Sequence, residues 1–502
     1  MISAARERPE AGVERDRRDL HRGVLVNGLG YVVKTAFPLL MGLVIWLYGK
    51  EEFGLFTAAQ SIVLVALRVC VLGLDKAILW WVPRQTEGAA GCGIARALIF
   101  SLTAAGFAAI LVTAILAPAL AAWKEIPEAT WSLRLMAISL VPMSATEILV
   151  GAVLGRRKME AQVIVKEVAQ PFTFLLLAVA AFAAGLREMA LAGAFLASQG
   201  VALLAAILVF RREFGSLPRA AGAASGSRDL VRYALPMWGA EISNAFLLRL
   251  DTLVLLALYD VGTVGVYGVV VMIGNAVRTI RRAFDPIVLA IVSRISSRKE
   301  MPRLRAAFSH ATSLVIATQL PVYAFVLLFV PWILPILGEG YDAASTPVIV
   351  ICGFWMVNGV LGLNGLIVSG FGRSDLAFLN VLLTIAVEAA LLFLLVPPFG
   401  IVGASIAVGA AYTVQNAVQA VQARWLSGAW NYEAKVARIM AAGLAAAAAL
   451  AAIWWIARPA GEFLARAVAF AGFLAVLGIS VLWMIRRGDL AADRAQRGCD
   501  SR

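Results

Sequence analysis

Long apolar segments follow one another along almost the whole chain, and each is about as long as a helix that crosses a membrane. Such a helix needs about 20 apolar residues to cross roughly 30 Å of hydrocarbon. Charged residues make up only 15% of the 502 residues, too few to cover the surfaces of soluble domains. The sequence therefore predicts an all-α polytopic membrane protein.

Fourteen segments fit this length. They cover residues 23–48, 53–74, 97–121, 133–154, 163–184, 189–210, 233–258, 264–280, 311–336, 346–370, 376–397, 402–423, 436–457 and 463–484. Most of them end at charged or turn-forming stretches such as GKEE, WKEIPE and GFGRSD. The 22 residues before the first segment have no apolar core, so they are interpreted as a cytoplasmic tail and not as a signal peptide.

Basic residues are distributed unequally between the two sides that these spans define. An even number of spans puts both chain ends on one side, and most of the 44 Lys and Arg lie there, in the tails and in loops such as 75–96 and 211–232. The opposite side receives Lys50, Lys124, Arg187, Arg458 and Arg466. Because basic loops stay in the cytoplasm, both termini of this plasma-membrane protein are predicted to be cytoplasmic. The same asymmetry accounts for the net charge of +13, so no nucleic-acid partner is inferred.

Two pairs of segments recur at a nearly constant spacing. LYGKEEFGLF at 47–56 resembles LYDVGTVGVY at 258–267, and LAGAFLA at 191–197 resembles IVGASIA at 401–407. They indicate a parallel repeat of two six-helix bundles, an architecture of transporters that bind substrate between the halves, although chance similarity among Gly/Ala/Leu-rich helices is the alternative. The predicted parts are a tail (1–22), a first bundle (23–210), a linker (211–232), a second bundle (233–424), two further transmembrane helices (425–485) and a tail (486–502).

Four basic residues lie at depths in the spans where a charge is costly. An ionisable residue at mid-helix costs at least about 2.5 kcal/mol, so Lys34, Arg68, Arg249 and Arg278 each require a reason. Ammonium and guanidinium groups that face a cavity suit an anionic ligand, and Arg binds phosphate bidentately. These four residues are therefore predicted to bind substrate. Alternatively, Arg278 extends to the cytoplasmic interface, and Arg249 pairs with a carboxylate on a neighbouring helix.

Four acidic residues, Glu147, Glu241, Asp251 and Glu388, lie deep within spans. A buried carboxylate can carry a proton, or can coordinate Na⁺ with the help of carbonyl groups. Either would couple transport to an ion gradient, so these residues are predicted to be ion-coupling sites. The alternative is that each is a neutral or paired structural carboxylate.

Motifs for enzyme chemistry do not occur in the sequence. It has no GxxxxGK[ST] phosphate-binding loop, no HExxH and no GxSxG. Two His and four Cys without a CxxC spacing leave little material for a metal site. No catalytic residue, metal or cofactor is predicted beyond coupling to H⁺ or Na⁺, and the chain is not expected to be an enzyme.

Four stretches resemble bacterial polysaccharide flippases of the Wzx type. They are GKEEFGLFTAAQSIVLVALRVCVLGLDKAILWWVPR (49–84), RLDTLVLLALYDVGTVGVY (249–267), LPVYAFVLLFVPWILPILGEGYDAASTPVIVI (320–351) and GLIVSGFGRSDLAFLNVLL (365–383). The resemblance covers about residues 20–425. It implies the superfamily shared with multidrug/toxin extruders and the lipid II flippase, whose fold is two six-helix bundles in a V, often followed by two more helices.

The resemblance also implies a function. Such a flippase moves an undecaprenyl-pyrophosphate-linked oligosaccharide across the plasma membrane by alternating access, for O-antigen, capsule or exopolysaccharide biosynthesis. Its expected partners are that lipid-linked oligosaccharide, membrane lipids, and the polysaccharide polymerase and chain-length machinery. The cationic residues of the family's cavity do not occupy fixed motif positions, so the assignment of the four basic residues rests on their depth.

Three other functions stay open at this point. A cation-coupled multidrug/toxin extruder and a lipid II flippase share the implied fold. A membrane glycosyltransferase or polysaccharide polymerase would be equally apolar, but such enzymes have large extracytoplasmic loops, and the predicted outer loops here are short.

Overall fold

The computed structural model is helical throughout the part of the chain that it describes, and no β-strand occurs in that part. The described residues are 7–85, 87–156, 158–187, 189–215, 227–282, 285, 288, 292, 301–361, 363–428, 430, 434–457, 459, 461–475 and 478. Backbone contacts divide the chain into two compact units, Met1–Val269 and Val270–Arg502. The predicted tail 486–502 and residues 216–226 of the predicted linker lie outside the described residues.

Nine helical stretches among the described residues are long and apolar enough to cross a membrane. Two of them join a pair of predicted spans, because α1 (Glu7–Val71) and α17 (Ser374–Ser427) are each interrupted only by a glycine with non-helical dihedral angles. Gly49 has φ 74° and ψ 179°, and Gly400 has φ 55° and ψ −133°. The all-α membrane fold is confirmed, whereas the count of fourteen spans stays a prediction.

The first helix starts earlier than the apolar pattern indicates. α1 begins at Glu7, so residues 7–22 of the predicted tail are helical. Arg and Glu are frequent in this stretch and favour helix. A helix that is already nucleated also extends readily through polar residues, because each added residue gains a hydrogen bond without a new nucleation step.

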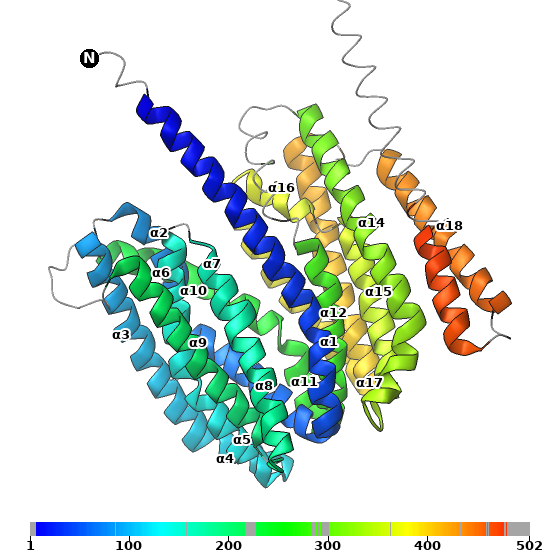
Figure 1. Cartoon of the computed structure of the whole chain (residues 1–502), viewed down its shortest axis with the longest axis horizontal. Helices are drawn as coiled ribbons and strands as arrows, with labels where there is room; N and C mark the ends of the chain where they lie inside the picture. The colour runs from blue at the N-terminus through cyan, green and yellow to red at the C-terminus, as the bar shows by residue number, and fades with distance from the viewer. Residues whose placement is uncertain are drawn as a thin grey trace, which may run out of the picture. The chain divides into compact units, whose positions relative to one another are not determined.

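The first unit is a bundle in which α6 lies between α3 and α9, and α8 packs on α9 (Figure 1). Its helices after α1 are α2 (Leu74–Trp81), α3 (Glu87–Leu111), α4 (Ala117–Lys124), α5 (Pro127–Ile138), α6 (Leu140–Gly155), α7 (Glu160–Gln162), α8 (Gln170–Ala183), α9 (Ala190–Phe214), α10 (Ser227–Leu247), α11 (Leu250–Leu258) and the start of α12 (Val261–Arg282). Large apolar side chains such as Phe107 and Leu208 are about 70% exposed, at 71% and 67%, as expected for helices that face lipid.

Two short π-helical stretches, Val112–Leu116 and Val163–Ala169, widen the first unit's helices. Each ends two residues before a proline, Pro118 or Pro171. A proline removes one backbone hydrogen bond and its ring clashes with the preceding turn. A π-helical turn lets the helix continue past that clash, which explains why both spans remain unbroken.

The two segments identified as repeats, 47–56 and 258–267, contact each other reciprocally. A Cβ atom on Gly54 would lie 1.9 Å from the Val261 carbonyl oxygen, and one on Gly265 would lie 2.0 Å from the Lys50 carbonyl oxygen. Lys50 and Val261 stand at equivalent positions, four residues before their glycines. A two-fold relation between the repeated hairpins makes each glycine approach the equivalent carbonyl group of the other hairpin. Glycine at both positions permits this approach because it has no side chain.

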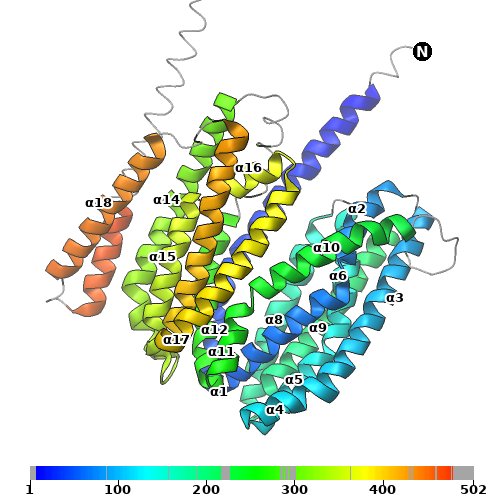
Figure 2. The same ribbon diagram turned by 180° about the vertical axis from the view of Figure 1, so that it is seen from behind.

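The second unit contains the rest of α12 and the helices that follow it. These are α14 (Met301–Ile333), α15 (Ser345–Leu361), α16 (Asn364–Gly370), α17, α18 (Ala434–Ala457) and a helical stretch at 462–475, with 3₁₀ turns at Leu334–Leu337 and Tyr341–Ala344. α15 packs against α14 and α17, and α18 packs against α14. Buried residues Leu328, Ala446 and Phe473 join α14 to α18 and the last helix, which lie side by side in Figures 1 and 2.

Candidate functional site

A tight turn after α1 places a short helix against the first bundle. Leu72 and Gly73 have positive φ values of 55° and 68°. A Cβ atom on Gly73 would lie 2.6 Å from the Ala234 carbonyl oxygen, so glycine lets α10 approach the turn. α2 then packs against α6 and α10. The predicted loop 75–96 therefore starts with a largely buried helix.

The turn brings three carboxylates around the guanidinium group of Arg68. Its Nη1 atom lies 3.6 Å from Asp75 Oδ2 and 3.6 Å from Glu241 Oε2. Its Nη2 atom lies 3.7 Å from Glu147 Oε1. Asp75 can come this close because Gly151 of α6 has no side chain, since a Cβ atom there would lie 2.8 Å from the Asp75 carbonyl oxygen.

Two lysines complete this arrangement. Lys76 Nζ lies 3.5 Å from Asp75 Oδ2 and 4.0 Å from Glu241 Oε1. Lys166 Nζ donates a hydrogen bond of 2.7 Å to Glu147 Oε2. We call these six residues the charged network: Arg68, Asp75, Lys76, Glu147, Lys166 and Glu241. Its three cations and three carboxylates balance.

The charged network is balanced in charge but incompletely hydrogen-bonded. The Lys166–Glu147 contact has the length of a charge-assisted hydrogen bond, whereas the ion pairs around Arg68 and Lys76 are longer. Among the described residues, Arg68 Nη1 and Asp75 Oδ1 are buried without a hydrogen-bond partner. A buried polar atom in that state costs about 1–3 kcal/mol. A proton, a cation or an anion that arrives here can therefore change which groups pair.

Arg249 and Asp251 lie at the break between α10 and α11, apart from these ion pairs. Asp251 is 5% exposed. It accepts hydrogen bonds from the backbone N–H of Thr252 at 2.6 Å, the Thr252 hydroxyl at 3.2 Å and the Tyr267 hydroxyl at 2.8 Å. Both carboxylate oxygens thus have donors, and the bond from Tyr267 ties α11 to α12. A role of Asp251 in ion coupling and of Arg249 in substrate binding stays a prediction.

Arg278 of the second unit lies against two aromatic rings. Its guanidinium carbon is 4.7 Å from the centre of the Trp355 ring and 4.2 Å from that of Tyr412. Arg281 and Arg282 follow on the same face of α12, because residues three and four apart are neighbours on a helix. Arg281 Nη1 donates a hydrogen bond of 3.0 Å to Asp285 Oδ1.

We call Arg278, Arg281 and Arg282 the arginine cluster. It carries more positive charge than Asp285, its carboxylate neighbour in the described part of the chain, can balance. A guanidinium group stacked on aromatic rings gains cation–π energy, yet its N–H groups remain suited to phosphate oxygens. An anion with phosphate oxygens fits this combination.

The remaining predicted residues lie elsewhere. Glu388 of α17 is fully buried, at 0% exposed. Lys34 falls within α1, but its side chain lies outside the part that the structure describes. No group of three or more His, Cys, Asp or Glu side chains able to hold a metal ion occurs among the described residues. Arg68, Glu147 and Glu241 are thus the predicted residues that the structure brings together.

Sequence reasoning missed half of the charged network. Asp75 and Lys76 stand in the stretch LDKAILWW, whose apolar residues recur with helical spacing, so a short amphipathic helix could have been recognised there. Lys166 lies in the span after Glu147, and no local spacing rule pairs residues on different helices. Trp355 and Tyr412 look like ordinary apolar residues of their spans, so only the packing of α12, α15 and α17 identifies them.

The chain is similar to known proteins in sequence and in fold. The sequence matches the family described as polysaccharide biosynthesis protein over residues 46–346. No match was found among curated proteins.

Solved transporters share the fold. An inward closed structure of the lipid II flippase MurJ is 12% identical, has a TM-score of 0.75, and covers 93% of this chain and 99% of its own. An inward-facing multidrug resistance MATE transporter of the MOP superfamily is 14% identical with a TM-score of 0.67, and covers 79% of this chain and 98% of its own. A MOP superfamily transporter from Pyrococcus furiosus, with a binding pocket of reverse polarity that suggests a different function, is 16% identical with a TM-score of 0.58, over 83% of this chain and 96% of its own.

Proposed function

Because this chain belongs to the polysaccharide biosynthesis protein family, we propose that it is a flippase that moves a lipid-linked oligosaccharide across the plasma membrane. The substrate we propose is an undecaprenyl-pyrophosphate-linked oligosaccharide, moved from the inner to the outer leaflet. A polysaccharide polymerase and its chain-length machinery would then use the product. The fold shared with the lipid II flippase supports this proposal.

The observation that carries the proposal is the arginine cluster beside Trp355 and Tyr412. Three guanidinium groups within one turn of α12 suit the two phosphates of a pyrophosphate, since each Arg can donate two parallel hydrogen bonds. The rings of Trp355 and Tyr412 are buried and lie 5.3 Å apart, and their contacts with Arg278 hold its guanidinium group in place. A lipid-linked sugar diphosphate presents the phosphate oxygens that such fixed guanidinium groups bind.

The same charges argue against a multidrug/toxin extruder as the first choice. Drugs moved by such proteins are usually cationic, and a cation would be repelled by the arginine cluster. The charged network of the first unit is neutral as a whole, with Arg68, Lys76 and Lys166 balancing three acids. It therefore offers no surplus of negative charge for a drug.

The charged network supports a coupling role. Arg68 is shared among Asp75, Glu147 and Glu241 at 3.6–3.7 Å. Binding of H⁺ or Na⁺ to one of these carboxylates would weaken its hold on Arg68 and allow the guanidinium group to pair with a phosphate. Loading of the ion and loading of the substrate would thereby be linked through one side chain. Lys34, on the same helix, is proposed to assist in binding the anion.

The test measures glycan export and membrane abundance on the same variants. We expect Arg278→Ala to lower export by about tenfold or more at unchanged abundance, because a charge-assisted hydrogen bond contributes about 1.5–3 kcal/mol. Arg278→Lys should retain more export than Arg278→Gln, because charge is the property in use. Arg424→Gln is the matched control, since Arg424 stacks on Trp430 at the same 4.7 Å but at the end of α17.

Two outcomes would contradict the proposal. Normal glycan export by Arg278→Ala, at normal abundance, would remove the arginine cluster from the mechanism. Export of a cationic drug that depends on Glu241, with no effect on glycan, would instead assign the protein to the extruders.

A further inference from the structure

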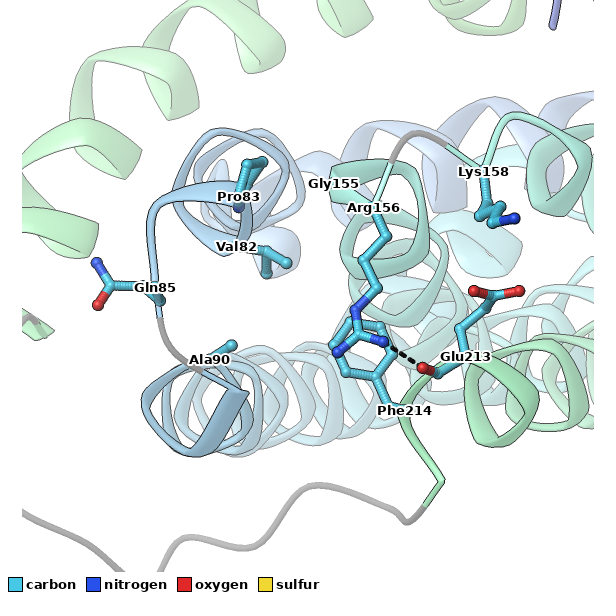
Figure 3. A pocket seen from close by; sticks show the side chains of 9 residues that line it. All are labelled: Val82, Pro83, Gln85, Ala90, Gly155, Arg156, Lys158, Glu213 and Phe214. Atoms are coloured by element: carbon cyan, nitrogen blue, oxygen red, sulfur yellow. Dashed lines mark hydrogen bonds between the residues drawn. The ribbon is translucent and has the colours of Figure 1, made fainter. Parts of the chain in front are cut away.

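A pocket of about 380 Å³ opens at one end of the first unit, and its lining includes no residue of the charged network. Figure 3 shows it between the 3₁₀ turn Val82–Arg84, the start of α3, the end of α6 and the end of α9. The lining residues are Val82, Pro83, Gln85, Ala90, Gly155, Arg156, Lys158, Glu213 and Phe214. This volume suits a phosphate with its ester groups, and it is small for acyl chains.

The helix ends hold the walls of this pocket in fixed positions. Gly155 lets the turn after α2 approach α6, because a Cβ atom there would lie 3.0 Å from Val82 Cβ. Arg156 donates a hydrogen bond to the carbonyl oxygen of Glu213 in the last turn of α9, and its guanidinium carbon lies 3.9 Å above the Phe214 ring. A cation there also interacts favourably with the negative end of the α9 dipole.

Charge makes the pocket selective for anions. Arg156 extends across it in Figure 3, and Lys158 lies on the next turn of chain beside it. Glu213 is the acidic residue of the lining, so the two cations leave an excess of positive charge. Exposed Arg211 and Arg212 in the last turn of α9 add to the positive potential at its rim.

The flanks of the pocket face lipid. Leu208 of α9 is 67% exposed and Ile99 of α3 is 51% exposed, each one to three turns from the pocket along its helix. The distribution of basic loops puts this end of the bundle at the cytoplasmic surface. Basic pockets between membrane helices on that side bind the head groups of anionic lipids.

We propose that this pocket binds the phosphate head group of an anionic phospholipid of the inner leaflet. Arg156 and Lys158 contact the phosphate, and the acyl chains run down the exposed faces of α3 and α9. The bound lipid joins the ends of α3, α6 and α9 and so stabilises the cytoplasmic end of the first unit. The site lies outside the residues proposed for transport, and it does not depend on which substrate is moved.

The test is native mass spectrometry of the purified full-length protein titrated with phosphatidylglycerol or phosphatidylcholine. We expect Lys158→Gln and Arg156→Gln each to weaken phosphatidylglycerol binding about fivefold, since a basic residue at an anionic head group contributes about 1 kcal/mol. Phosphatidylcholine binding should not change. Arg187→Gln is the matched control, because Arg187 stacks on Phe182 at 4.9 Å in the loop after α8 and does not line the pocket.

Lys158→Gln keeps the test valid if Arg156→Gln does not fold, because Lys158 is exposed and makes no cap on α9. Unchanged phosphatidylglycerol binding by Lys158→Gln and the double variant would overturn the proposal. Competition by inorganic phosphate at the same concentration as the lipid would also overturn it, because the ligand would then be a soluble phosphate compound.

Discussion

At the scale of single residues, three cations and three carboxylates of the first unit meet at one place and balance there. Arg68 lies within 3.7 Å of three carboxylates from α2, α6 and α10. A buried pair of this kind contributes little net stability, but removal of one partner is costly because the other charge remains. The charged network therefore holds the bundle together while leaving its pairings open to exchange.

Glu147 and Lys166 form the shortest ion pair of the charged network, and removal of either one should show the cost of the charge that is left behind. We expect Glu147→Gln or Lys166→Met alone to destabilise the protein by roughly 2–3 kcal/mol, below the range for a fully buried pair because Lys166 is 28% exposed. The double variant should recover part of the loss, since neither charge is then unpaired. Thermal unfolding of the purified protein measures the cycle. Arg373→Gln, which removes a surface pair with Asp375, is the control and should change little.

Full additivity of the two single effects would mean that Glu147 and Lys166 do not interact, and that the 2.7 Å contact has no energetic role.

The hydroxyl of Tyr267 should stabilise the protein through its hydrogen bond to the Asp251 carboxylate. Tyr267→Phe removes the 2.8 Å hydrogen bond to Asp251 and leaves a buried oxygen without that donor. We expect a loss of about 1–3 kcal/mol, read as a lower midpoint of thermal unfolding. Tyr233→Phe is the control, because its ring stacks on Trp80 at 4.5 Å and phenylalanine keeps that contact. Equal midpoints for the two variants would contradict the structural role of Asp251.

At the scale of elements, glycines decide where long apolar stretches turn. Gly49 has φ 74° and ψ 179°, a region that essentially only glycine occupies. Gly400 follows Pro397 and Pro398 and turns α17 in the same way. The sequence marks both turns, through the charged stretch GKEE at Gly49 and the prolines before Gly400, and the predicted spans end there.

The two glycines in the reciprocal contact of the repeated hairpins should be the most sensitive to substitution. We expect Gly54→Ala or Gly265→Ala to prevent accumulation of folded protein, because the added methyl group would lie about 2 Å from a backbone carbonyl oxygen, at 1.9 Å and 2.0 Å. Gly49→Ala should cost about 1–3 kcal/mol through its dihedral angles alone, since its Cβ atom meets nothing within 4 Å. Gly106→Ala in α3 also has open space and should be tolerated.

Membrane abundance and the midpoint of thermal unfolding measure these variants. Normal abundance of Gly265→Ala would mean that the two hairpins do not meet as described.

At the scale of the whole molecule, the basic loops set the orientation. We expect reporter fusions at Gly49 and Glu339 to behave as periplasmic, and fusions at Gly226 and Arg502 as cytoplasmic. The pair at Glu339 and Gly226 is informative, because these positions lie in different parts of the chain and respond independently. A cytoplasmic signal at Glu339 would require a different number of spans before it, and a periplasmic signal at Gly226 would move the proposed lipid pocket to the other leaflet.

The class of fold and several helix positions follow from the apolar runs of the sequence. Such runs lie in lipid and each has the length of a bilayer, so α9, α12 and α18 fall close to predicted spans. Arg68, Glu147 and Glu241 could also be chosen in advance, because a charge at that depth is costly and requires a partner. The repeated hairpins could be aligned because a glycine recurs at 54 and 265, where the backbone of each hairpin approaches the other.

Only the tertiary structure decided which of these residues meet. Asp75 and Lys76 became part of the charged network when α2 folded back onto α6, and Lys166 reached Glu147 from another helix. Trp355 and Tyr412 became partners of Arg278 through the packing of three helices. The physical reason is that hydropathy and spacing act along one helix, whereas a contact between helices depends on rotation, tilt and small residues such as Gly151. Those quantities are properties of the packed bundle and not of any single segment.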